Sequence, residues 1–211
     1  NLIESIVQEV VSKMEGNTSV SVSKTVSAHD IAKMIDHSLL RPQLTRQEVE
    51  EGCRLAKEYD CATVCVKPCD VLVAHGILKD CDVKVTTVVG FPHGAHLTET
   101  KVLEADMAMS QGCEELDMVL NIDRMKSGDY DYVEKDITAV VDAAKRRGVM
   151  TKVIFENFYL TDDEIVRACE MCERAGADWV KTSSGFADGG ATIHDLKLMR
   201  KTVSPRIQVK A

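Results

Sequence analysis

The stretch from GluLeuAspMetValLeuAsn (115–121) to ThrLysValIlePheGlu (151–156) contains one complete strand–helix–strand unit. Both ends are short apolar runs, rich in branched aliphatic residues, of the kind that forms buried parallel strands. The residues between them, 130–147, have the pattern of a helix. Because a crossover helix joins parallel strands of one sheet, this stretch predicts a βαβ unit.

The same alternation continues in both directions along the chain. Further strands are predicted at 34–40, 62–67, 83–91, 178–183 and 206–211. Further helices are predicted at 46–59, 98–111, 162–175 and 193–202, with another that opens at Pro68. Four pairs have the spacing of helix caps, namely Ser27 with Asp30, Thr45 with Glu48, Thr161 with Glu164, and Thr192 with Asp195. Strict alternation of strand and helix predicts an α/β fold with a parallel sheet.

An open doubly wound sheet and a closed barrel both fit this order of elements. The dinucleotide-binding form of the open sheet needs a Gly-rich turn after its first strand, and SerLeuLeuArgPro (38–42) has none. An even repeat of roughly 30 residues favours the (β/α)8 TIM barrel, in which about 250 residues close eight units.

The predicted barrel occupies residues 27–211, and residues 1–26 form an N-terminal extension. The extension has an amphipathic helical pattern over 1–15, followed by a Ser/Thr/Val-rich linker or short edge strand over 17–26. The chain stops in the seventh strand, so strand eight and the C-terminal helix of a full barrel are missing. We therefore expect the 211 residues to be an incomplete record of a longer protein.

Composition excludes several classes of function. The formal net charge is −8 and no basic cluster stands out, which disfavours nucleic-acid binding. No run of 18 apolar residues is present, so no membrane span is expected. Cys169 and Cys172 suggest half a metal site, but their helical setting without a second pair favours buried packing. His93 and His96 are likewise interpreted as loop residues, so no metal is predicted. The eight cysteines are interpreted as reduced thiols, which fit a cytoplasmic location.

Five charged residues interrupt the apolar strands, and in a barrel such residues are candidates for catalysis. They are Asp36, Asp117, Lys152, Lys181 and Lys210. A buried charge is costly unless it has a partner or a chemical task.

Lys181 is the candidate nucleophile. It lies between Val180 and Thr182, where burial and the second cation Lys210 on the next strand should lower its pKa. A neutral amine attacks an aldehyde or ketone and forms an imine. The alternative is a lysine at a strand edge whose ammonium reaches solvent. The Gly-rich loop at 185–190 favours the first interpretation, because free backbone amides there would bind an anion such as a phosphate group.

Asp117, Lys152 and Asp36 each have a structural interpretation beside the catalytic or binding one. Asp117 would transfer protons, or would be a core carboxylate bonded to backbone amides. Lys152 is more simply an internal ion pair with Glu156 on the same face of its strand. Asp36 would orient Lys210 or bind a substrate hydroxyl, or would cap a helix.

Several motifs occur together in the order typical of one enzyme family. They are IleAspHisSerLeuLeuArgPro (35–42), ValValGlyPhePro (88–92), GluLeuAspMetValLeuAsn (115–121), LysValIlePheGlu (152–156), ValLysThrSerSerGlyPhe (180–186), GlyGlyAlaThr (189–192) and ValLysAla (209–211). From about residue 27 to its end the chain resembles the deoxyribose-phosphate aldolase family, a group of class I, Schiff-base-forming aldolases.

The resemblance implies a function and a role for each site residue. Lys181 matches the Schiff-base lysine, and Asp117 with Lys210 matches the proton-transfer pair. Gly185 and Phe186 fall where the phosphate-binding loop begins. Asp36, Lys152 and Ser183 complete the expected substrate-binding residues. The implied reaction is reversible cleavage of 2-deoxy-D-ribose 5-phosphate, a small phosphorylated sugar, to acetaldehyde and D-glyceraldehyde 3-phosphate, without a metal or an organic cofactor.

The chain departs from the family pattern at the phosphate loop. Ser184 stands where the family usually has Thr, and Ala187 with Asp188 replaces a Gly-rich step. Two alternatives stay open at this point: a Schiff-base aldolase for another sugar phosphate, and a truncated, non-catalytic barrel that serves as a binding or regulatory partner. The sequence does not determine the oligomeric state and leaves a homo-oligomer possible.

Overall fold

The structure is a computed structural model that describes residues 26–211. The helix predicted over 1–15, and all but the last residue of the linker, lie outside the described residues. Seven strands form one sheet: β1 (Asp36–Leu39), β2 (Thr63–Val66), β3 (Lys84–Val89), β4 (Glu115–Val119), β5 (Met150–Ile154), β6 (Trp179–Lys181) and β7 (Gln208–Lys210). Each lies within a predicted strand or one residue from it.

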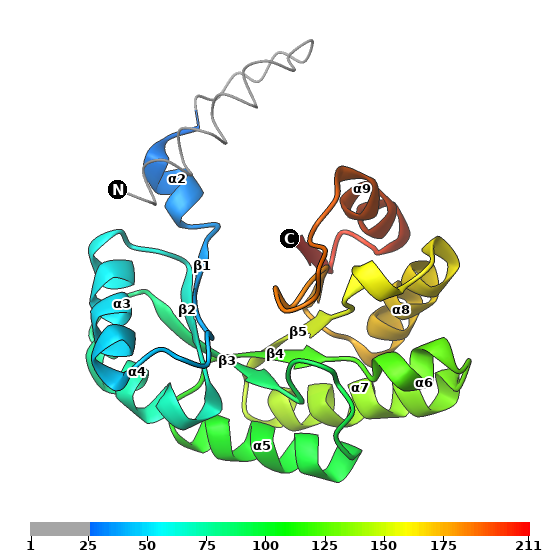
Figure 1. Cartoon of the computed structure of the whole chain (residues 1–211), viewed down its shortest axis with the longest axis horizontal. Helices are drawn as coiled ribbons and strands as arrows, with labels where there is room; N and C mark the ends of the chain where they lie inside the picture. Colours follow the sequence, from blue (N-terminus) through cyan, green and yellow to red (C-terminus); the bar gives the residue numbers. More distant parts are fainter. Residues whose placement is uncertain (1–25) are drawn as a thin grey trace.

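All neighbouring strands are parallel, and their order in the sheet is the order of the sequence, from β1 to β7. The sheet curls, and the helices lie on its outer side (Figure 1). They are α2 (Ala28–Ala32), α3 (Arg46–Glu58), α4 (Val71–Leu78), α5 (Thr98–Ser110), α6 (Ile122–Lys126), α7 (Tyr130–Arg146), α8 (Asp162–Ala175) and α9 (Ile193–Thr202), with the short 3-10 turns η1 (Pro68–Asp70) and η2 (Asn157–Tyr159). The chain is thus an α/β protein with a curled, parallel, seven-stranded sheet.

The helix boundaries follow from capping. The side chains of Ser27, Thr45, Thr161 and Thr192 each accept the backbone N–H three residues later, and the first three form complete capping boxes. Two short elements, η1 and α6, were not predicted as separate elements from the sequence. Pro68 opens η1, which precedes α4, and α6 lies in a stretch for which no element was predicted.

Side chains alternate between the two faces of the sheet. Val64 and Val66 of β2 belong to the large core between strands and helices, whereas Cys65 between them faces inward. The inner apolar cluster is small: Leu40, Cys65 and Val88, with Phe91 packed against them. The interior also carries charged side chains, which are described below.

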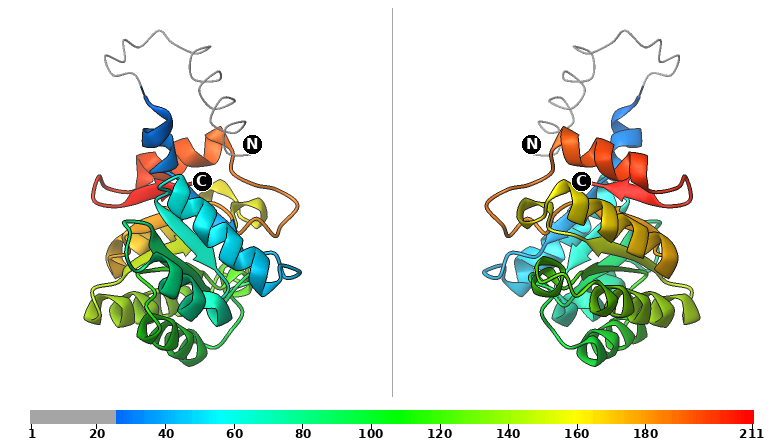
Figure 2. Two further views of the ribbon diagram at one scale, coloured as in Figure 1. Left: turned by 90° about the vertical axis from the view of Figure 1, so that its left-hand side faces the viewer. Right: turned by 90° about the vertical axis from the view of Figure 1, so that its right-hand side faces the viewer.

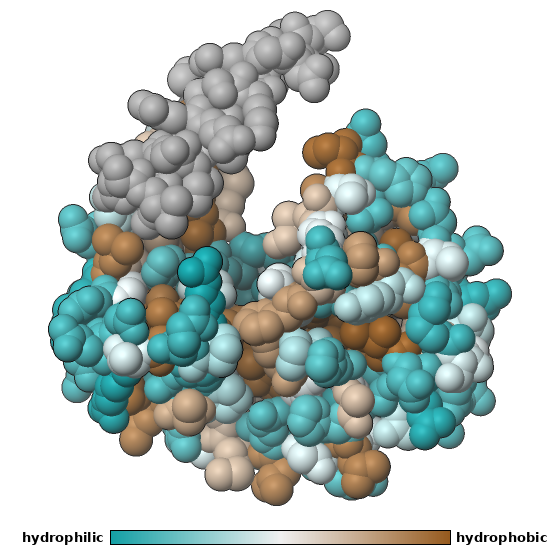
Figure 3. All heavy atoms as spheres, in the orientation of Figure 1, coloured by the Kyte–Doolittle hydropathy of each residue, from teal (hydrophilic) through white to brown (hydrophobic). Residues whose placement is uncertain are grey.

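The two edge strands, β1 and β7, are not paired with each other. The views in Figure 2 place α2 and α9 at the same end of the molecule. Figure 3 shows that the surface is hollowed between the side that carries α2 and the side that carries α9. Lys210 Nζ crosses toward β1 and donates to the carbonyl oxygen of Met34 at 2.7 Å. A cavity of about 670 Å³ at this opening is lined by residues including Asp36, Lys152 and Trp179.

Within residues 26–211, none of the helices combines the length and the apolar character that crossing a bilayer requires.

Candidate active site

Charged side chains of alternating sign form a network of ion pairs inside the curl of the sheet. Lys181 Nζ lies 2.6 Å from Asp117 Oδ2, and Lys152 Nζ lies 3.2 Å from Asp117 Oδ1. Lys152 also makes a short contact with Glu115, whose other oxygen is 3.4 Å from Lys84 Nζ. The strand register explains this arrangement, since Asp117 of β4 is the direct neighbour of Lys152 of β5. The sheet therefore brings Lys181, Asp117 and Lys152 together.

Lys181 is the last residue of β6, and 14% of its side chain is exposed. Burial lowers the pKa of its ammonium group, but the carboxylate of Asp117 raises it, so that the pKa lies above its ordinary value. The lowered pKa expected from the sequence is therefore wrong for this arrangement, because that expectation left out the direct carboxylate contact.

Lys152 has three carboxylate neighbours and is almost completely buried. Two of them are Asp117 and Glu115. The third is Asp36, whose Oδ2 lies 3.7 Å from Lys152 Nζ. Burial lowers the pKa of Lys152, but these charges outweigh it and raise the pKa above its ordinary value. The predicted pair between Lys152 and Glu156 is wrong, since Glu156 lies beyond the end of β5 and bonds Ser184 instead.

Asp36 pairs with Lys210, in line with one of the three interpretations given for Asp36. Asp36 Oδ1 lies 3.2 Å from Lys210 Nζ. Burial raises the pKa of Asp36, but the charges of Lys152 and Lys210 lower it below its ordinary value. Lys210 is the direct strand neighbour of Lys181. Its ammonium group nevertheless contacts Asp36 and Met34 rather than the side chain of Lys181.

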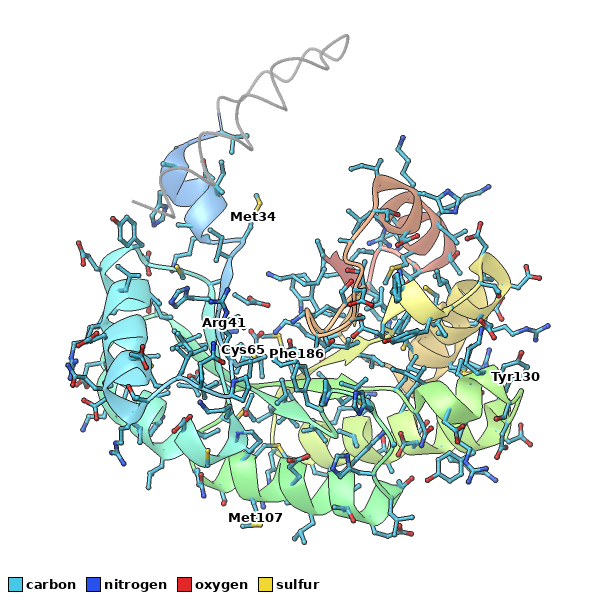
Figure 4. All side chains as sticks on the ribbon, in the orientation of Figure 1. Met34, Arg41, Cys65, Met107, Tyr130 and Phe186 are labelled. Atoms are coloured by element: carbon cyan, nitrogen blue, oxygen red, sulfur yellow. The ribbon has the colours of Figure 1, made fainter. Side chains whose placement is uncertain are left out.

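The loop that follows Lys181 forms one rim of the site. Ser183 Oγ donates to Thr182 Oγ1 at 3.1 Å, and Gly185 has φ +83°, which a glycine adopts without strain. The ring of Phe186 packs edge-on against Phe91, with centroids 5.1 Å apart. Figure 4 shows Phe186 and Cys65 in the hollow of the sheet. Phe186 thus packs across the rim against the end of β3.

The buried thiol of Cys65 faces the same interior as Lys181. Burial, and then the charge of Asp117, raise the pKa of this thiol well above its ordinary value. A protonated thiol is a poor nucleophile.

Glu115 and Glu156 were not among the predicted site residues. Glu115 had a readable signal, because it lies two residues before Asp117 and must share its face of β4. Glu156 had none, since its position depends on how the chain leaves β5. Among residues 26–211, no cluster of three or more His, Cys, Asp or Glu side chains is placed to hold a metal ion.

Comparison with known proteins identifies the family of this chain. The sequence profile of the DeoC/LacD family aldolases matches residues 30–208. The deoxyribose-phosphate aldolase of Caldanaerobacter subterraneus subsp. tengcongensis is 54% identical over 191 residues, which are 90% of this chain and 83% of that protein. The deoxyribose-phosphate aldolase of Thermoanaerobacter pseudethanolicus is 56% identical over 183 residues, covering 86% of this chain and 82% of that protein.

Solved structures give the same result. An aldolase designated QR15 superposes with a TM-score of 0.82 at 40% identity, over 86% of this chain and 80% of its own. The deoxyribose phosphate aldolase of Aeropyrum pernix, described as tetrameric, has a TM-score of 0.82 at 30% identity, over 90% of this chain and 80% of its own. The chain therefore belongs to the DeoC/LacD family of aldolases.

Proposed function

We propose that this chain acts as a deoxyribose-phosphate aldolase, a lyase that reversibly cleaves 2-deoxy-D-ribose 5-phosphate to acetaldehyde and D-glyceraldehyde 3-phosphate through an imine on Lys181. The observation that carries the proposal is the contact between Lys181 Nζ and Asp117 Oδ2 at 2.6 Å, on the inner face of the curled sheet. An amine that forms an imine must first lose a proton, and this carboxylate is within reach to accept it.

The reaction then follows from the chemistry of the imine. The free amine of Lys181 attacks C1 of the open-chain aldehyde, and loss of water gives a protonated imine. A base removes the proton of the C3 hydroxyl, the C2–C3 bond breaks, and its electron pair moves into the imine as an enamine. D-glyceraldehyde 3-phosphate leaves, C2 of the enamine takes up a proton, and water releases acetaldehyde from Lys181.

Asp117 and Lys210 carry the proton transfers in this proposal. Asp117 contacts Lys181 directly, and Lys210 is the neighbour of Lys181 on the next strand. Lys152 donates to the other oxygen of Asp117 at 3.2 Å and holds the carboxylate in place. Asp36 holds Lys210 and lines the cavity at the opening.

The phosphate group is assigned to the loop after β6, with Ser183, Gly185 and Phe186. Within the described part of the chain, the backbone N–H groups of Gly185 and of residues 187–191 donate to no protein acceptor. These amides lead into the N-terminus of α9, which Thr192 caps. Free amides at the start of a helix favour an anion.

We further propose that the sheet is the larger part of an eight-stranded TIM barrel, with residues 1–26 as an extension to it. This chain covers 80–83% of the aldolases with which it was compared, and among residues 26–211 β1 and β7 are the edges of the sheet and do not pair with each other. Eight free cysteines favour a reducing, cytoplasmic location. The tetrameric relative makes a homo-oligomer the natural first state to test by light scattering.

Imine trapping tests the catalytic assignment. The protein is incubated with acetaldehyde and sodium borohydride, and peptide mapping locates the added two-carbon group. We expect the adduct on Lys181, its loss in Lys181→Leu, and no change in Lys197→Leu, which removes an exposed lysine of α9. A folded protein without an adduct on Lys181 would contradict the proposal and would favour a non-catalytic barrel. Turnover of a keto-sugar phosphate instead would indicate a different aldolase.

A further inference from the structure

The segment by which the chain leaves β5 supports the loop that follows β6. The first segment, residues 156–159, is named the β5 exit, and the second, residues 182–191, the β6 loop. The backbone N–H of Asn157 donates to the carbonyl of Thr182 at 2.9 Å. Farther along the loop, a side chain on Gly189 would lie 2.3 Å from a ring carbon of Phe158. The β5 exit thus touches the β6 loop near both of its ends.

Glu156 makes the central contact between the two segments. Its carboxylate oxygens accept the backbone N–H of Ser184 at 3.2 and 3.3 Å, and one of them also accepts the Ser184 hydroxyl in a short bond. Only 2% of Glu156 is exposed. No lysine, arginine or histidine of the described residues lies within ion-pair distance of it. A buried carboxyl group is costly unless it is hydrogen-bonded, and the two donors of Ser184 supply these bonds.

The backbone of Glu156 indicates that this contact is specific. Its φ is +56° and its ψ is 61°, a left-handed conformation that is uncommon for a residue with a long side chain. Such conformations persist where the surrounding structure holds them, and they gather at functional sites. In Glu156 this conformation turns the chain out of β5 and brings the carboxylate beneath Ser184.

The contact continues into the turn that bears Gly185. Because the hydroxyl proton of Ser184 is directed to Glu156, a lone pair of Ser184 Oγ is free to accept the N–H of Phe186, at 3.0 Å. Phe186 in turn packs against Phe91 at the end of β3. The turn at 184–186 is therefore held by Glu156 on one side and by Phe91 on the other.

We propose that Glu156 is a positioning residue that holds the turn at 184–186 in the shape that receives the substrate phosphate. It contacts neither Lys181 nor Asp117, so it acts on the phosphate end of the substrate and leaves imine formation unaffected. This inference rests on the proposed function, because it assumes that the β6 loop binds phosphate during an aldolase reaction.

Two substitutions at Glu156 distinguish the effect of the carboxylate from the effect of the backbone conformation. Glu156→Gly removes the carboxylate and suits a positive φ, so it leaves the backbone unstrained. Glu156→Gln keeps the size and one acceptor oxygen and should retain part of the function. The matched control is Glu164→Gln, which alters another carboxylate that accepts a backbone N–H, that of Thr161 at 2.7 Å, on α8.

The test compares kcat/KM for 2-deoxyribose 5-phosphate with kcat/KM for unphosphorylated 2-deoxyribose, alongside borohydride trapping of acetaldehyde on Lys181. We expect Glu156→Gly to lower the first value by about 10- to 100-fold, mainly through KM, since small displacements of binding groups have effects of this size. The second value and the trapping rate should stay within about 2-fold. Glu156→Gln should fall between wild type and Glu156→Gly, and Glu164→Gln should match wild type.

Two results would overturn the inference. One is an unchanged preference for the phosphorylated substrate in both Glu156 variants. The other is an equal loss with both substrates together with lost trapping, in protein that melts like wild type, which would place Glu156 in the chemistry. If Glu156→Gly does not fold, Glu156→Gln decides by the same two measurements. Failure of the wild-type protein to trap acetaldehyde would instead contradict the proposed function, so the two failures are distinguishable.

Discussion

Lys181 Nζ donates to Asp117 Oδ2 at 2.6 Å, although the two residues are 64 positions apart in the sequence. Their strands, β6 and β4, are separated by β5, so the contact spans the inside of the curl. Asp117 is fully buried and shares its other oxygen with Lys152. The carboxylate therefore determines how readily Lys181 gives up its proton.

Asp117→Asn should move the pH dependence of imine formation to lower pH. Asp117 raises the pKa of Lys181, so its removal leaves burial, which lowers that pKa, as the larger influence. The fraction of free amine then rises at lower pH than in the wild type. The measurement is the rate of borohydride-trapped acetaldehyde adduct as a function of pH. Asp142→Asn, which removes an exposed charge on α7, is the control.

The direction of this shift separates two roles of Asp117. Turnover should fall in Asp117→Asn as well, because the variant also loses a proton acceptor. An inflection that stays in place while turnover falls would limit Asp117 to proton transfer. An inflection at higher pH would contradict the electrostatic effect of Asp117 on the Lys181 amine.

Lys101 and Asp136 form a second buried pair, outside the site. Both side chains are fully buried, and Lys101 Nζ lies 2.5 Å from Asp136 Oδ2 and 2.9 Å from the carbonyl oxygen of Val119. The pair joins α5 and α7 to the end of β4, the strand that carries Asp117. We expect Asp136→Asn to lower the free energy of unfolding by about 3–5 kcal/mol, because it leaves a buried ammonium group without its counterion.

Urea denaturation would measure this loss. The double variant Lys101→Met with Asp136→Leu should recover most of it, since it removes both charges from the interior. The control is Glu134→Gln, which breaks the exposed pair with Arg174 and should change the stability by less than about 1 kcal/mol. Equal losses in Asp136→Asn and Glu134→Gln would show that burial does not decide the strength of these pairs.

Asp36 should contribute to stability against acid. The charges of Lys152 and Lys210 hold its pKa below the ordinary value of 3.8 in the folded protein. A carboxyl with a lowered pKa stabilises the fold at higher pH, and this contribution is lost as the pH falls through the folded-state value, because the unfolded chain takes up the proton first. Asp36→Asn should therefore lower stability at pH 7, by about 2 kcal/mol for a bond to a charged group.

The same variant should flatten the dependence of stability on pH below about pH 4, where unpaired aspartates titrate. Thermal unfolding measured between neutral and acidic pH would test this. Asp142→Asn again serves as the exposed control. An acid dependence as steep as that of the wild type in Asp36→Asn would mean that other carboxyl groups dominate acid unfolding.

Periodicity and capping were sufficient to predict the α/β class and the order of the seven strands, because each strand and most helices have a local signal. The helix at 162–175 is bounded by the capping box of Thr161 and by Gly176, which has φ +76°, and it occurs with the predicted bounds. Parallel pairing of β4 with β5 follows from the helix between them. The five charged residues that interrupt strands were identifiable for the same reason, since each breaks an apolar run.

Contacts between distant elements were not predictable in the same way. The sequence indicated that Lys181 is buried, but the raised pKa depends on Asp117, which reaches it from a strand that is not its neighbour. Likewise, Glu156 was assigned to Lys152 because the two share a strand pattern. The chain turns at Glu156 with positive φ and aims the side chain at Ser184. Such a turn has no periodic signal in the sequence.

Gly189→Ala should disturb the β6 loop by displacing Phe158. An added Cβ would lie 2.3 Å from Phe158 Cδ2, much closer than van der Waals contact allows, so the loop or the ring must move. We expect a rise in KM for 2-deoxyribose 5-phosphate of about 10-fold, with trapping of acetaldehyde on Lys181 retained, because loop displacement acts on binding and not on the amine.

A compensating substitution tests whether the clash is the cause. Phe158 is about half exposed, at 52%, so Phe158→Ala should be tolerated by itself and should make room for the new methyl group. The double variant Gly189→Ala with Phe158→Ala should therefore recover much of the lost affinity. Gly190→Ala is the matched control, since a Cβ at Gly190 would meet no atom within 4 Å. An equal rise in KM for Gly189→Ala and Gly190→Ala would point to lost backbone freedom in the loop and not to the contact with Phe158.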